Sequence, residues 1–123
     1  MAIKIYRWLS ILFALCIALQ VFLAGLAVFS DASHWKDHVS FVRYFSLIPV
    51  VMLVLAIIGR APALRMHSLA LIFMIVLMFV TAIFASDIGL FSALHPVIAL
   101  MLFWRTFDTI RLSKKWTAEP EQA

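Results

Sequence analysis

The chain has 123 residues, of which 66% are hydrophobic and only 13% are charged. Soluble domains average about 45–50% apolar and about 25% charged residues, so these figures exclude a water-soluble globular domain. They also exclude an intrinsically disordered chain. The composition therefore predicts one integral membrane domain with the lipid bilayer as its main partner. We attribute its formal net charge of +4 to membrane topology and expect no nucleic-acid partner.

Four apolar segments follow one another along the chain, at about residues 8–30, 39–59, 66–86 and 90–110. Each is close to the roughly 20 residues that a helix needs to cross a membrane. The links between them are residues 31–38, 60–65 and 87–89. Pro62 cannot continue a helix, so it predicts a turn over the second link.

Links this short make neighbouring helices antiparallel. The sequence thus predicts an all-α fold, an integral membrane antiparallel four-helix bundle formed by residues 1–112. A polar cytoplasmic tail is expected at residues 113–123. In such a bundle the second and fourth segments lie diagonally across the core.

Basic residues are distributed unequally between the two ends of the predicted bundle. Eight of the ten lie at one end: Lys4, Arg7, Arg60, Arg65, Arg105, Arg111, Lys114 and Lys115. Only Lys36 and Arg43 belong to the other. The positive-inside rule then predicts a multi-pass protein of the inner (plasma) membrane with both termini in the cytoplasm.

Two histidines enter the bundle from its outer side. His38 opens the second segment and His95 opens the fourth. Neutral imidazole is the commonest metal ligand in proteins, and two imidazoles from facing helices can ligate a haem iron axially. His34, four residues before His38, is an alternative ligand, and with Asp37 the two histidines also allow a weak surface zinc or copper site. The competing interpretation is that these histidines cap helices or bind lipid headgroups.

The two histidines reach the same depth only if the fourth helix is longer than its apolar core. At 1.5 Å per residue, His38 lies about 33 Å from the inner end of its segment, whereas His95 lies about 15 Å from Arg105. The depths match if the fourth helix continues to Arg111. Arg105 and Asp108 then lie inside the inner end of the bundle, where their spacing allows an ion pair.

Two further polar residues occur at membrane depth, where polar groups are costly and are functional candidates. Gln20 either packs between helices or bonds to a ligating histidine or cofactor. Arg43 either extends to lipid phosphates or neutralises a haem propionate. A weak internal repeat is also visible, since Gln20 precedes His38 as Thr81 precedes His95.

Several kinds of site have no counterpart in the sequence. No acidic residue lies in the middle of a segment, which separates the chain from small proton-coupled exporters. The one cysteine, Cys16, allows no intrachain disulfide. No Ser-His-Asp set or metalloprotease motif is present.

Three short stretches carry a resemblance to a known family. They are Leu-Gln-Val-Phe-Leu-Ala-Gly at 19–25, Trp-Lys-Asp-His at 35–38 and Ala-Leu-His-Pro-Val-Ile-Ala at 93–99. Over residues 6–110 the chain resembles a family of small four-span bacterial membrane proteins of unknown function. That family in turn looks like one half of haem A synthase.

This resemblance implies that His38 and His95 are the haem ligands and that Gln20 is the polar residue of the first helix. The catalytic carboxylate of the synthase has no counterpart here, because Asp37 adjoins His38 in a different setting. The polar residue of the third helix is replaced by Thr81. We therefore expect haem binding without synthase activity.

Together these observations predict a haem-binding membrane protein resembling a small b-type cytochrome, with haem b as cofactor. It would act in electron transfer or haem handling, with a quinone or another redox partner. A homo-oligomer or a larger membrane complex is compatible with the sequence. The alternatives are a cofactor-free accessory subunit of a membrane complex and a small transporter.

Overall fold

The computed structural model describes residues 1–118, so the last part of the predicted tail, residues 119–123, lies outside the described residues. The described elements are all helical: α1 (Ala2–Phe29), η1 (Ala32–His34), α2 (Trp35–Phe45), α3 (Ile48–Ile58), α4 (Pro62–Ile83), α5 (Ala85–Ile88), η2 (Gly89–Ala93) and α6 (Leu94–Ala118). They form four segments that are long and apolar enough to cross a membrane. The predicted all-α, four-span fold is confirmed.

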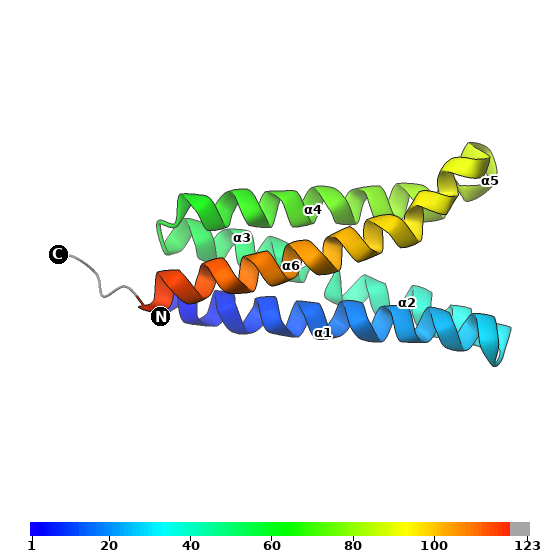
Figure 1. The fold of residues 1–123 in the computed structure, drawn as a ribbon, viewed down its shortest axis with the longest axis horizontal. Coiled ribbons are helices and arrows are strands. Elements are labelled where there is room, and N and C mark those ends of the chain that lie inside the picture. The colour runs from blue at the N-terminus through cyan, green and yellow to red at the C-terminus, as the bar shows by residue number, and fades with distance from the viewer. Residues whose placement is uncertain (119–123) are drawn as a thin grey trace.

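The four spans form a bundle with the predicted diagonal arrangement. Both α3 and α6 pack against α1 and α4, so α3 and α6 occupy opposite corners. One end of the bundle holds the N-terminus, the α3–α4 turn and the end of α6, and we call it the terminus end (Figure 1). The other end holds η1, α5 and η2, and we call it the loop end. The α1–α2 and α4–α6 pairs separate toward the loop end (Figure 1).

The second span is broken, whereas the sequence predicted one continuous helix over 39–59. It consists of η1, α2 and α3, with a break at Ser46 and Leu47. Pro49, in the first turn of α3, has no N–H to donate to the carbonyl of Phe45, so the α-helical ladder cannot run through this point.

The predicted link over residues 31–38 is mostly helical. Asp31 caps η1, because its Oδ1 accepts a hydrogen bond of 2.7 Å from the backbone N–H of Ser33. Hydrogen bonding from Ser33 holds the pKa of the Asp31 carboxyl below its usual range. An extra helical turn thus forms where the sequence indicated a loop.

The α3–α4 turn is shorter than the predicted turn over residues 60–65. Pro62 begins α4, a position that proline favours because its fixed φ suits the first helical residue and its missing N–H would be unpaired there. Gly59 permits a close approach, since an added Cβ would collide with the side chain of Ile3. Arg60 makes the turn with a positive φ of 50°.

Between α5 and α6 the chain changes direction at Gly89. Its φ of +53° is readily adopted only by glycine. The helix α6 then runs from Leu94 to Ala118. It therefore continues past Arg111, as predicted from the depths of the two histidines. It also includes residues 113–118 of the predicted tail, where Ser113 is buried.

The apolar core occupies the half of the bundle nearer the terminus end. Its buried side chains come from all four spans: Tyr6, Phe13, Ile17, Phe45, Met52, Ala56, Ala61, Leu64, Leu71, Ile75 and Leu102. In the loop-end half, taken as residues 18–44 and 76–101, the buried residues are Gln20, Ala27 and Thr81. Two of these three are polar, so the loop-end half has little apolar core of its own.

Candidate functional site: a histidine pair at the loop end

His38 is held to α1 by two reciprocal hydrogen bonds. Its Nδ1 lies 3.1 Å from the backbone carbonyl oxygen of Gln20. The side-chain Nε2 of Gln20 donates in return to the backbone carbonyl of His38, at 2.9 Å. The sequence suggested Gln20 as a partner of the histidine. The acceptor of the ring N–H is its main-chain oxygen, and its side chain fixes the backbone of α2.

His95 is held to α4 in a closely related way. Its Nδ1 lies 3.1 Å from the backbone carbonyl oxygen of Met78 and 3.0 Å from Oγ1 of Thr81. The Thr81 hydroxyl already donates to carbonyl oxygens of its own helix, on Leu77 at 2.9 Å and Met78 at 3.0 Å. Toward His95 it therefore acts as an acceptor.

These bonds determine which ring nitrogen carries the proton when each histidine is neutral. A carbonyl oxygen only accepts hydrogen bonds, so Nδ1 is the protonated nitrogen in both His38 and His95. Each Nε2 then keeps a free lone pair. A ligating histidine nearly always donates its other ring N–H to a carbonyl, carboxylate or water, and both histidines already meet this condition.

The two imidazoles come from opposite corners of the bundle, because α2 continues into α3, diagonal to α6. His38 and His95 are both half-buried. Both histidines thus lie toward the loop end, His38 on α2 and His95 on α6.

Gln20 contributes a second unusual feature to this region. Its side chain is only 8% exposed, and its Oε1 has no hydrogen-bond partner among the described residues. A buried acceptor left unpaired costs about 1–3 kcal/mol. Gln20 therefore offers an acceptor that a donor on a bound molecule or a water can use.

Arg43 lies on a different face of α2 from His38. It lies five residues after His38, about 140° further around the helix, and it is exposed. This position suits an extended side chain that reaches lipid phosphates. The structure does not favour the propionate contact over that alternative.

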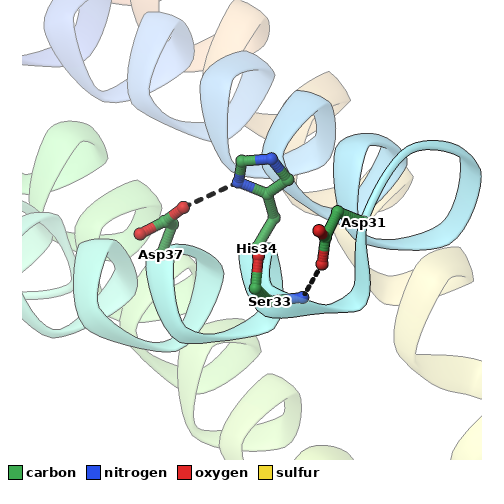
Figure 2. Close-up of polar contacts among 4 residues, drawn as sticks. All are labelled: Asp31, Ser33, His34 and Asp37. Carbon is green, nitrogen blue, oxygen red and sulfur yellow. Dashed lines mark hydrogen bonds and ion pairs between the residues drawn. The ribbon is translucent and has the colours of Figure 1, made fainter.

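His34 is directed to a carboxylate instead of to the histidine pair. Its Nδ1 lies 2.8 Å from Oδ2 of Asp37, as Figure 2 shows beside the Asp31–Ser33 cap. Within residues 1–118, no group of three or more histidine, cysteine or acidic side chains lies close enough to hold a metal ion. The zinc or copper site suggested for this loop is therefore not formed.

The terminus end holds a separate polar group. His67 lies 3.1 Å from Oγ1 of Thr109 on α6, far along α4 from Thr81. Asp108 pairs with Arg111 at 3.6 Å, whereas the sequence predicted a pair with Arg105. Arg111 is the more exposed choice, and pairing there removes less water from the charges.

Sequence reasoning missed the role of the helix backbone in holding both rings. Residue identity does not show which main-chain carbonyls accept hydrogen bonds, so Met78 was not predicted as a partner of His95. One signal was present in the spacing. The bonded residues are 18 apart in the first pair and 17 apart in the second, which supports the weak internal repeat.

Comparison with known proteins places the chain in a family. Residues 20–85 match a family model described as a family of unknown function (DUF6220). The match includes Gln20, His38 and Thr81, while His95 lies outside it. No curated protein and no solved structure matches the chain. Because the model covers more than half of its residues, the chain belongs to this family of unknown function, DUF6220.

Proposed function

We propose that this protein binds haem b between His38 and His95 and acts as a small b-type cytochrome-like protein in electron transfer or haem handling. One observation carries the proposal. Each histidine donates Nδ1–H to a backbone carbonyl at 3.1 Å, from helices at opposite corners of the bundle. Two imidazoles held by such hydrogen bonds are suited to axial ligation of one iron.

The distribution of buried residues supports a large, partly apolar ligand at this level. The loop-end half of the bundle buries little apolar side-chain surface, although folded interiors are normally close-packed. A porphyrin is a flat apolar plate of the kind that fills the space between diagonal helices. The resemblance to one half of haem A synthase that we inferred from the sequence implies the same two histidines as ligands.

His38 and His95 would hold the iron, and bound haem would supply one-electron chemistry. The protein's own residues fix the geometry around it. The carbonyls of Gln20 and Met78 hold the ring orientations, and the hydroxyl of Thr81 strengthens the hold on His95. The unpaired Oε1 of Gln20 is available to a donor group at this level. No carboxylate stands where the synthase has its catalytic one, so we propose no synthase reaction.

The test is the spectrum of the protein purified from cells grown with ample haem precursor. We expect a Soret band and, after reduction, the sharp bands of low-spin, six-coordinate haem at one haem per chain. Two neutral imidazoles produce a low-spin iron, which distinguishes this site from adventitious haem in the detergent micelle.

A protein that folds but stays colourless, and that takes up no haem in titration, would overturn the proposal. The accessory-subunit interpretation would then take its place. A high-spin spectrum unaffected by substitution of either histidine would also count against it, since such haem is bound elsewhere.

We further propose that the terminus end faces the cytoplasm across the inner membrane, because that end carries eight of the ten basic residues. Ser33 in η1 and Lys115 near the end of α6 are both exposed, so a cysteine at either site is accessible to reagent. In a Cys16→Ala background, Ser33→Cys is expected to react with an impermeant thiol reagent in intact cells, and Lys115→Cys only after permeabilisation.

Labelling of both variants after permeabilisation is the control for accessibility. The reverse pattern in intact cells would invert the orientation and leave the four-span fold unchanged.

A further inference from the structure

A cavity lies at the terminus end, remote from the histidine pair. Its volume is about 250 Å³, and it is lined by Lys4, Arg7, Trp8 and Thr117. The first three belong to the beginning of α1 and the last to the end of α6. The two helices pack against each other, so the cavity sits where the first and last spans of the bundle meet.

The charges around this cavity favour an anion. Two cationic side chains line it, and none of its lining residues is acidic. Neither Lys4 nor Arg7 forms an ion pair with an acidic side chain of residues 1–118. The lining cations are therefore not neutralised by the described residues.

Arg7, which lines the cavity, also has an unpaired donor. Its Nε is buried and has no hydrogen-bond partner among the described residues. A buried donor without an acceptor is costly, the more so when it is charged. A phosphate satisfies a guanidinium especially well, because its oxygens accept two parallel charge-assisted hydrogen bonds.

The surroundings of the cavity favour a phosphate that is part of a lipid. Trp8 is 71% exposed, and indole rings concentrate at the headgroup level of membranes. Beyond it, Leu12, Leu15 and Leu19 are exposed at helical spacing along the same face of α1. This apolar stripe provides a path for an acyl chain that starts at the cavity.

From these observations we infer that the cavity binds the phosphate of an anionic phospholipid, with Lys4 and Arg7 on the phosphate and the acyl chain along the α1 stripe. The Thr117 hydroxyl donates to the carbonyl of Lys114 at 2.9 Å, so it presents an acceptor. That acceptor suits a headgroup with hydroxyls, such as phosphatidylglycerol. The site is independent of haem binding.

The experiment counts lipid retained by the full chain in native mass spectrometry after incubation with phosphatidylglycerol or phosphatidylcholine. We expect preferential retention of phosphatidylglycerol. Arg7→Gln and Lys4→Gln are each expected to weaken it about five-fold, the typical effect of one basic residue near an anionic lipid surface. Lys115→Gln removes the same charge from the same end without lining the cavity, and should leave retention unchanged.

A second arm uses inorganic phosphate in lipid-free detergent. Phosphate binding that depends on Arg7, without any preference for phosphatidylglycerol, upholds the phosphate site and assigns it to a soluble source. Equal loss of phosphatidylglycerol from all three variants overturns the inference, because diffuse surface charge then explains the binding. Lack of binding to both anions also overturns it. Lys4 is exposed, so its variant remains informative if Arg7→Gln folds poorly.

Discussion

Replacing either His38 or His95 with alanine is expected to abolish the low-spin haem spectrum, because each substitution removes one of two axial ligands. The loss should be complete in both variants. The fold should survive in the first case, since Gln20 bonds to the backbone carbonyl of residue 38 at 2.9 Å, and alanine keeps that carbonyl. The measurement is the optical spectrum of equal amounts of folded protein, with added imidazole expected to restore part of the low-spin signal.

Three control substitutions sharpen this result. His67→Ala acts at the terminus end and Arg43→Leu acts on the exposed face of α2, so neither should change the spectrum. His34→Ala tests whether the neighbouring histidine ligates instead. If His34→Ala removes the signal and His38→Ala does not, the ligand assignment is wrong. If both His38→Ala and His95→Ala keep the unaltered spectrum, the proposed site is excluded.

Replacing Phe13 with alanine is expected to destabilise the bundle by about 3 kcal/mol, within the range for buried phenylalanines. Phe13 is fully buried, and its ring centroid lies 5.9 Å from that of Phe45 at the end of α2. Phe45 in turn lies 5.1 Å from Phe41. Because apolar lipid reduces the hydrophobic driving force between helices, such close packing is a main source of stability. The measurement is reversible unfolding in detergent micelles.

Leu15→Ala is the matched control on the same helix. Leu15 is 64% exposed and faces the surroundings of the bundle, so its truncation leaves no cavity and should cost about 0.5 kcal/mol or less. Phe13→Ala should also accelerate haem loss, since the Phe13–Phe45 contact ties the helix that carries His38 to α1. Equal destabilisation by the two substitutions would contradict a buried Phe13 and an exposed Leu15.

The composition and the hydrophobic segments were sufficient to predict the four spans and the bundle. Long apolar runs have few structural solutions in lipid, where each backbone polar group needs an internal partner, and short links limit how neighbouring helices are connected. The diagonal placement of the second and fourth spans followed from the same reasoning. The positions of His38 and His95 on these spans were equally predictable, because they depend only on where each segment begins.

Element boundaries were less predictable, since polar residues can continue a helix beyond its apolar core. The link at 31–38 became η1 and part of α2, and α6 extended to Ala118. At Pro49 the sequence pattern was apolar on both sides and concealed a break in the helix. Hydropathy reports burial in lipid, whereas the break depends on one missing backbone donor.

Only the tertiary structure decided what each ring nitrogen contacts and where the apolar core ends. The acceptors of His38 and His95 are main-chain carbonyls of Gln20 and Met78, which any residue type supplies and no motif records. The cavity lined by Lys4, Arg7, Trp8 and Thr117 joins opposite ends of the chain. Sequence periodicity determines which residues a helix presents on one face, but the pairing of faces depends on how four helices pack at once.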